Sequence, residues 1–470
     1  MPIATTNPTT GEVVRTFEEL SEQELDARLE RASVAFRSYR RTSYEQRTGW
    51  LRAAADLLDA EAQTTAELMT LEMGKTVAAA RAEVAKCAVG FRYYADHGPA
   101  FLADEEVDAA AVRAGRAYVR WQPLGPVLAI MPWNFPLWQA VRFAAPALLA
   151  GNVGLLKHAS NVPQTALYLE DVLTRAGFPA DVFSTLLIGS EQVERVLRDD
   201  RVVAATLTGS TPAGRSVAAI AGDELKPTVL ELGGSDPFVV MPSADLERAA
   251  TVAATARCQN NGQSCIAAKR FIVHQDVADE FERLFADALR ALVVGDPTAE
   301  ATDVGPLATR SGRDGVAALV DEAVGKGARL VLGGAAPGGP GWFYPPTLVT
   351  DVTRDMGLYA EEVFGPVAVL HRAKDLDEAL ELANDTVFGL GSNAWTNDPA
   401  EQERFATELD AGMVFVNGMT ASYPELPFGG IKDSGYGREL ADLGIRAFCN
   451  AKTVWVGGSD SGDTSTPRAE

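Results

Sequence analysis

The sequence predicts an α/β fold in which two domains are each built around a largely parallel β-sheet. The first observation is length, because 470 residues exceed what one hydrophobic core usually serves. The second is alternation, since short apolar runs and amphipathic helical segments follow one another from about residue 124 onward. Such alternation favours a parallel sheet whose two faces are covered by helices. The third is composition, with 47% apolar and 23% charged residues, which is ordinary for a globular enzyme.

Residues 21–110 are predicted to be helical. Leu25, Leu29 and Phe36 follow helical spacing, and Ser21 with Glu24 forms a capping box at the start. Residues 107–123 then predict a strand that lies between elements of the first domain. The elements expected after it are an apolar run at 127–131, strands at 153–156, 182–188 and 202–207, and helices at 140–149, 165–176, 191–197 and 213–221.

A second alternating series begins after Glu231. Its expected strands lie near 271–273, 330–332, 367–370 and 414–416, and its helices include 277–292 and 376–383. The last residues, 457–470, are rich in Gly, Ser, Asp and Thr, which predicts a disordered tail.

Charge and composition exclude several classes of partner. The net charge of −22 argues against nucleic acid, because phosphate binding requires positive charge. No apolar run has membrane-spanning length, and the N-terminus lacks the pattern of a signal peptide. Four cysteines make no disulfide framework, so we expect a cytoplasmic protein. The four His and four Cys lack ligand spacing, so no metal site is expected.

Glu231 and Cys265 each stand in a glycine-bearing phrase, which indicates a nucleophile and its general base. The alternative for Cys265 is a buried apolar cysteine, the interpretation that we accept for Cys87, Cys258 and Cys449. Cys265 differs because polar residues surround it. For Glu231, which follows an apolar strand, the alternative is a buried carboxylate in an ion pair.

Two further segments indicate phosphate binding at the ends of strands. Gly209 and Ser210 lie between a strand and a helix, where backbone N–H groups and a helix dipole favour an anion. The spacing from Gly209 to Ser216 also resembles a P-loop, but Arg215 replaces its lysine and is no equivalent. Lys157 to Ser160 end another strand and suit a dinucleotide, although a solvated loop lysine explains Lys157 equally well.

Together, six ordered motifs over nearly the full length resemble the aldehyde dehydrogenase superfamily, and several phrases resemble its short bacterial succinate-semialdehyde dehydrogenases. The motifs are Pro-Trp-Asn-Phe-Pro at 132–136, Thr-Gly-Ser at 208–210, Glu-Leu-Gly-Gly at 231–234, Gly-Gln-Ser-Cys at 262–265, Glu-Glu-Val-Phe-Gly-Pro at 361–366, and Pro-Phe-Gly-Gly-Ile-Lys-x-Ser-Gly-x-Gly-Arg-Glu at 427–439.

The resemblance implies a covalent mechanism. Cys265 would attack the aldehyde, and the Asn134 amide with the Cys265 backbone N–H would hold the oxyanion. Hydride transfer to the nicotinamide leaves a thioester, which Glu231 would hydrolyse by activating water. Glu231 argues against relatives that pass the acyl group to coenzyme A. Glu439 aligns with a family glutamate that is thought to assist proton movement.

The resemblance also implies NADP or NAD as the cofactor. Many NAD-preferring relatives have Glu at the position of Ser160, where its charge would repel a 2′-phosphate. Ser160 beside Lys157 therefore favours NADP slightly. The residues expected to contact the cofactor are Trp133, Asn134, Lys157, His158, Ala159, Ser160, Gly209, Ser210, Leu232, Glu362 and Phe364.

Succinate semialdehyde is the expected substrate, and its distal carboxylate calls for Arg or hydroxyl donors. Arg142 and Ser422 match substrate-contacting positions of long-form succinate-semialdehyde dehydrogenases, which implies that they bind this group. A second arginine of those enzymes is Gln259 here, so the site is weaker or is completed by Trp138 and Gln139. The near alternative is a broader semialdehyde or aliphatic aldehyde dehydrogenase.

The resemblance divides the chain into a dinucleotide-binding domain, residues 1–106 and 124–232, and a catalytic domain, residues 233–433. Residues 107–123 and 446–456 would form a β extension that joins protomers into a homodimer or homotetramer. A thioesterase-like hydrolase would leave Lys157, Ser160, Glu362 and Phe364 without a purpose. A non-catalytic structural role is disfavoured because every catalytic position is intact.

Overall fold

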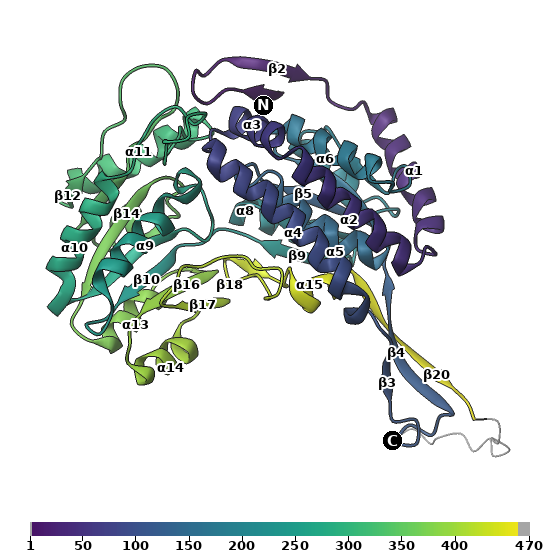
Figure 1. Ribbon diagram of the computed structural model, residues 1–470. Helices are drawn as coiled ribbons and strands as arrows, with labels where there is room; N and C mark the ends of the chain where they lie inside the picture. Colours follow the sequence, from purple (N-terminus) through teal and green to yellow (C-terminus); the bar gives the residue numbers. More distant parts are fainter. Residues whose placement is uncertain (1, 459–470) are drawn as a thin grey trace.

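The structure, a computed structural model, describes residues 2–458 and confirms the α/β fold. The chain forms two lobes, each built around one sheet, and a narrow β extension projects from the first lobe (Figure 1). The predicted disordered tail at 457–470 lies outside the described residues from position 459 onward.

The first lobe contains a six-stranded sheet, parallel except for one edge strand. Its order is β19 (Gly435–Tyr436), β9 (Thr228–Glu231), β8 (Ala204–Thr208), β5 (Pro126–Met131), β6 (Val153–His158) and β7 (Phe183–Thr185), with β19 antiparallel to β9. The predicted strand at 182–188 is shorter than expected. After Thr185 the chain turns, and the Ile188 N–H donates to the carbonyl of Leu186 instead of to a neighbouring strand.

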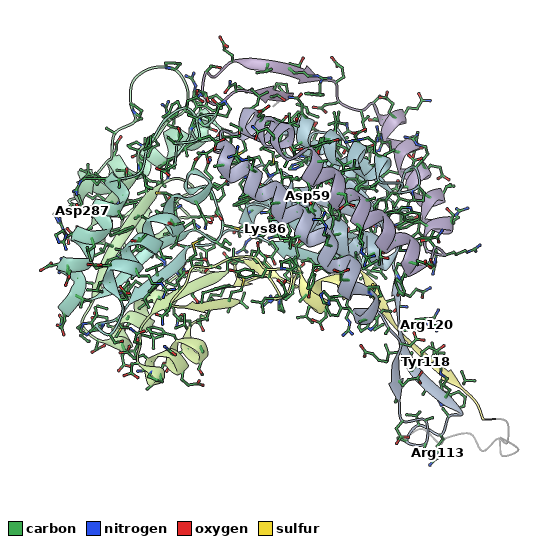
Figure 2. All side chains as sticks on the ribbon, in the orientation of Figure 1. Asp59, Lys86, Arg113, Tyr118, Arg120 and Asp287 are labelled. Atoms are coloured by element: carbon green, nitrogen blue, oxygen red, sulfur yellow. The ribbon has the colours of Figure 1, made fainter. Side chains whose placement is uncertain are left out.

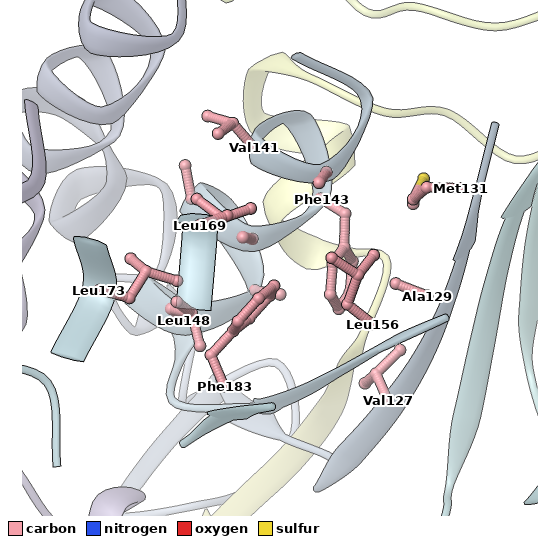
Figure 3. Packing of buried hydrophobic residues seen from close by; sticks show 14 of the residues in the cluster. Val127, Ala129, Met131, Val141, Phe143, Leu148, Leu156, Leu169, Leu173 and Phe183 are labelled. Atoms are coloured by element: carbon pink, nitrogen blue, oxygen red, sulfur yellow. The ribbon is translucent and has the colours of Figure 1, made fainter. Parts of the chain in front are cut away.

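Helices cover this sheet and bury its apolar side chains. They are α1 (Glu22–Tyr39), α2 (Tyr44–Ala60), α3 (Ala62–Met73), α4 (Val77–Phe101), α5 (Trp138–Ala150), α6 (Pro163–Arg175), η1 (Ser190–Gln192), α7 (Val193–Leu197), α8 (Thr211–Asp223) and α15 (Ala441–Arg446). The capping box predicted at Ser21 and Glu24 is present at the start of α1. Figure 3 shows the core between sheet and helices, where Phe143 of α5 packs near Leu156 of β6.

The second lobe contains a seven-stranded sheet, in which only β12 runs antiparallel to its neighbour. Its order is β12 (Arg329–Leu332), β13 (Thr347–Thr350), β14 (Val367–Ala373), β11 (Ala268–His274), β10 (Asp236–Val240), β16 (Gly391–Trp395) and β17 (Met413–Val416). Its helices are α9 (Leu246–Cys258), η2 (Gln259–Gly262), α10 (Gln275–Arg290), α11 (Arg310–Gly325), α12 (Gly357–Ala360), α13 (Leu376–Asn384) and α14 (Pro399–Glu408).

The chain crosses between the two lobes at residues that carry chemistry. It leaves the first sheet at Glu231, the last residue of β9, and enters the second at Asp236, the first residue of β10. It returns through β18 (Ile431–Lys432), which pairs with β15 (Phe388–Gly389), and then β19 pairs with β9. Residues from both lobes therefore meet around the 231–236 crossing.

Two small sheets complete the fold. At the N-terminus, β1 (Ile3–Thr6) pairs with β2 (Val13–Phe17). The extension consists of β3 (Glu105–Val107), β4 (Arg116–Pro123) and β20 (Cys449–Val456) in one antiparallel sheet. Figure 2 labels Tyr118 and Arg120 on this extension, where it joins the first lobe. No helix within residues 2–458 has the length and apolar character needed to cross a membrane.

Candidate active site

A cavity of about 310 Å³ lies where the carboxyl ends of β5, β8 and β9 meet the second lobe. The carboxyl ends of parallel strands share one edge of a sheet, which is the usual ligand-binding edge of α/β folds. Eight of the residues expected from the sequence to act in catalysis or cofactor binding line this cavity. Its lining residues are Pro132, Trp133, Asn134, Thr208, Gly209, Ser210, Leu232, Gly233, Cys265, Glu362 and Phe364.

A tight turn carries Cys265 into this cavity. Asn260 and Asn261 take left-handed backbone conformations, with φ of 54° and 58°, directly after α9 ends. The Lys269 ammonium then donates to the carbonyl oxygens of Cys265 at 2.8 Å and Ser264 at 3.1 Å. Because Lys269 is buried and fixed by these bonds, the backbone beneath the thiol is rigid.

The thiol of Cys265 is half-buried, and burial raises its pKa to about 12. The nearby cations Arg142 and Lys269 lower the pKa, whereas Glu362 and Asp236 raise it. Since the thiolate is the nucleophile, this environment favours the protonated, less reactive form of the cysteine at neutral pH.

We expect alkylation of Cys265 to accelerate about tenfold for each pH unit between pH 7 and pH 10, because the thiolate fraction grows in that proportion below the pKa. The rate is measured with iodoacetamide by intact mass, and a Cys265→Ser variant gives the background from the other cysteines. A rate that reaches a plateau below pH 9 would show that the thiol is more acidic than the structure indicates.

Asn134 lies on the loop that follows β5 and lines the cavity together with Cys265. Its Nδ2 donates to the carbonyl of Gln263 at 3.2 Å, and Asn260 Nδ2 donates to the Asn134 carbonyl at 2.7 Å. These two bonds fix the side-chain amide against the loop that carries the nucleophile. An amide donor and a backbone N–H beside a nucleophile can stabilise an oxyanion.

Glu231 ends β9 in a fully buried position. Neither carboxylate oxygen has a hydrogen-bond partner among the described residues. Burial raises the pKa of Glu231 well above its usual range, and Glu439 raises it further, whereas Arg142 and Arg438 lower it. Gly429 leaves the carboxylate room, because a Cβ at that position would stand 2.5 Å from Glu231 Oε1. A buried carboxyl group with an elevated pKa is suited to act as a general base.

Arg142, the expected substrate-binding arginine, lies on α5 of the first lobe. It is buried, forms an ion pair with Glu439, and donates to Thr208 Oγ1 at 3.3 Å. Its guanidinium also lies 4.4 Å from the centre of the Phe428 ring. The positive charge of Arg142 is therefore matched within the protein, and its assignment to the substrate stays a prediction.

The residues expected around the nicotinamide end of a cofactor are brought together. Glu362 accepts from the Gly234 N–H at 3.1 Å and lies 3.4 Å from the Lys269 ammonium. Phe364 meets Trp133 edge to face, with ring centres 5.6 Å apart. Gly233 leaves room for the Glu362 side chain, because a Cβ would stand 2.5 Å from Glu362 Oε2. The lining thus combines a carboxylate that can accept hydrogen bonds, aromatic walls and close backbone approach, which fit a dinucleotide.

The segment 157–160 lies at the end of β6, next to the end of β5. Burial lowers the pKa of Lys157, and the opposing effect of the negative charges of Glu191 and Glu19 is smaller. The ring nitrogens of His158 are bonded to the Pro136 carbonyl at 2.7 Å and the Ala159 N–H at 2.9 Å. His158 therefore fixes the loop before α5, and a direct cofactor contact of its ring stays a prediction. Ala159 and Trp133 pack against the same small apolar cluster of Met73, Val162 and Ala308, and Ser160 is partly accessible.

The remaining expected substrate residues form a second polar group around Trp138. Trp138 Nε1 donates to Ser422 Oγ at 3.0 Å, and Gln139 is buried beside it in the chain. Gln259 is partly buried, at the end of α9. The sequence analysis missed Lys86, whose ammonium donates to the same Ser422 Oγ at 2.5 Å. A lysine in a helical segment gives no local signal of such a role.

Comparisons with known proteins agree with this geometry. Residues 1–454 match the aldehyde dehydrogenase family. The chain is 68% identical to a succinate-semialdehyde dehydrogenase (NADP+) of Mycobacterium avium, over 98% of both chains. It is 65% identical to succinate-semialdehyde dehydrogenase (NADP+) 1 of Mycobacterium tuberculosis, over 97% of this chain and all of the other.

Among solved structures, it resembles the succinic semialdehyde dehydrogenase of Streptococcus pyogenes in complex with NADP+. The TM-score is 0.94 at 38% identity, over 97% of this chain and all of that one. Cys265 and Asn134 thus line one cavity, and Leu232 and Gly233, which directly follow Glu231, line it too. The chain belongs to the aldehyde dehydrogenase family.

Proposed function

We propose that this enzyme oxidises succinate semialdehyde to succinate with NADP as the preferred acceptor, and that it also accepts NAD. One observation carries the proposal. The site that joins Cys265, Asn134 and Glu231 belongs to a chain 65–68% identical to several NADP-dependent succinate-semialdehyde dehydrogenases. The NADP+ complex of the structurally similar streptococcal enzyme supports the same cofactor.

The residues of the chain divide the reaction into two steps. The Cys265 thiol releases its proton to solvent, Sγ forms a bond to the aldehyde carbon as the C=O π bond opens, and Asn134 Nδ2 with the Cys265 N–H holds the resulting oxyanion. NADP, when bound, would supply the two-electron oxidant that accepts hydride from this carbon, which leaves a thioester on Cys265. Glu231 then removes a proton from water, the water oxygen attacks the thioester carbon, and the C–S bond breaks. The products are the free acid and the regenerated cysteine.

The cavity residues and the end of β6 would hold the cofactor. Glu362 would accept hydrogen bonds from the nicotinamide ribose, and Gly209 with Ser210 would face the phosphates at the start of α8. Lys157 and Ser160 would face the adenosine ribose and its 2′-phosphate. Ser160 adds no negative charge there, and this supports acceptance of NADP.

We expect Ser160→Glu to raise the KM for NADP about 10- to 100-fold and to change the KM for NAD by less than about threefold. The reason is that a carboxylate repels the 2′-phosphate but can accept hydrogen bonds from a ribose hydroxyl. Steady-state kinetics with both cofactors measure the ratio. Ser311→Glu, an exposed position on α11, is the matched charge control. An unchanged ratio of the two KM values would remove Ser160 from cofactor selection.

A substrate panel tests the proposed function directly. Purified enzyme is given succinate semialdehyde, glutarate semialdehyde or butanal with each cofactor, and reduced nicotinamide is followed by absorbance. We expect the highest kcat/KM with succinate semialdehyde and NADP. Equal values for all three aldehydes would favour the alternative of a broad aldehyde dehydrogenase, and no signal with any aldehyde would reject a dehydrogenase.

We further propose the domain division given above and a homodimer or homotetramer joined through the extension. The extension pairs β4 with β20 away from both lobes and exposes Trp455 and Val456, which supports a role in association. Four unlinked cysteines support the proposed cytoplasmic location.

A further inference from the structure

A lysine, a tryptophan and a serine from three distant segments form one polar cluster at the start of α5. Lys86 lies on α4, Trp138 is the first residue of α5, and Ser422 lies on the loop after β17. The Lys86 ammonium donates to Ser422 Oγ at 2.5 Å and lies 4.6 Å from the centre of the Trp138 ring. Trp138 Nε1 donates to the same hydroxyl at 3.0 Å. Figure 2 labels Lys86 near the centre of the molecule.

The charge of Lys86 is not matched by a neighbouring carboxylate. Within residues 2–458 it takes part in no ion pair. Glu83, one turn earlier on α4, forms an ion pair with Lys75 and accepts from the Leu137 and Trp138 N–H groups, each at 2.9 Å. A half-buried ammonium that has only a hydroxyl and an aromatic ring as partners is suited to bind an incoming anion.

The loop before α5 carries Asn134, and α5 itself begins with Trp138 of the cluster, so the two residues are joined by a short segment of chain. Trp138 follows the oxyanion donor Asn134 by four residues, and Glu83 fixes the start of α5 between them. Cys265 packs against the same apolar cluster that contains Trp138. The charge of Arg142 acts on both the Cys265 thiol and the Lys86 ammonium, so both groups lie within electrostatic reach of that arginine.

We propose that the Lys86 ammonium and the Ser422 hydroxyl bind the distal carboxylate of the aldehyde substrate, while the Trp138 ring packs against its methylene groups. The inference rests on the proposed function, because Lys86 would recognise the terminal carboxylate of the semialdehyde substrate. In this arrangement the cation that binds the substrate is Lys86 and not Arg142, because Arg142 is ion-paired with Glu439. Lys86 acts as a specificity residue and takes no part in the chemical step.

The test compares Lys86→Met with wild-type enzyme on succinate semialdehyde and butanal, which have the same chain length but differ in the carboxylate. We expect kcat/KM for succinate semialdehyde to fall about 10- to 100-fold, mainly through KM, because a hydrogen bond to a charged group is lost. The value for butanal should stay within about twofold. Lys86→Arg should recover part of the loss, and Lys326→Met, at the exposed residue that caps the C-terminus of α11, is the control.

A second measurement uses succinate as a probe that needs no turnover. Its inhibition constant against butanal oxidation should rise in Lys86→Met by the same factor as the KM for succinate semialdehyde. An equal fall in kcat/KM for both aldehydes, or an unchanged inhibition constant, would overturn the role of Lys86. If wild-type enzyme itself shows no preference for succinate semialdehyde over butanal, the proposed function is wrong and this inference falls with it.

Discussion

Glu231→Gln is expected to lower steady-state turnover about 10²- to 10⁴-fold while one equivalent of reduced cofactor per active site still forms rapidly. Hydride transfer precedes the step for which the general base is needed, so the first turnover reaches the thioester and stops there. Gln has the shape of Glu, and neither oxygen of Glu231 is hydrogen-bonded in the described structure, so the substitution leaves the packing intact.

Rapid mixing with NADP and succinate semialdehyde measures this burst, and mass spectrometry of the quenched enzyme detects the acyl group on Cys265. Glu280→Gln, an exposed glutamate on α10, is the matched control and should behave as wild type. If the burst is lost together with turnover, Glu231 acts before the thioester forms, as the base that activates the Cys265 thiol.

The site residues that could be predicted from the sequence are those that directly follow a predicted strand. Asn134 follows the apolar run 127–131, Gly209 follows a predicted strand, and Glu231 ends another strand. Parallel strands place their carboxyl ends at one edge, so these residues had to converge once the alternation was recognised. The Cys265 turn was also visible, because glycine and asparagine favour the left-handed backbone found at Asn260 and Asn261.

The environment of the site could not be predicted, because it depends on contacts between segments far apart in the chain. The ion pair of Arg142 with Glu439 joins α5 to the segment after β19. Lys86 contacts Ser422, which is more than half of the chain away in sequence, and the residues around each give no indication of this contact. The pKa values of Cys265 and Glu231 likewise come from burial and from distant charges, which residue type alone does not reveal.

Arg142→Met is expected to destabilise the enzyme by about 3–5 kcal/mol near pH 8, because it leaves Glu439 buried without its cation. Arg142 lowers the pKa of both Glu439 and Glu231, so its removal raises both values further. Carboxyl groups of the unfolded chain titrate near about pH 4.3. The folded variant must hold protons that the unfolded chain has released, so its stability falls as pH rises from 5 to 8.

Urea unfolding at both pH values measures this loss, and kinetics on two aldehydes separate it from substrate recognition. We expect kcat/KM to fall by the same factor for succinate semialdehyde and butanal, because Arg142 acts through the charge state of Glu231 and the position of Glu439. A larger fall in kcat/KM for succinate semialdehyde than for butanal would show that Arg142 binds the distal carboxylate. The double variant Arg142→Met with Glu439→Gln should regain most of the stability, since it buries a neutral pair where either single change leaves a charge without its partner.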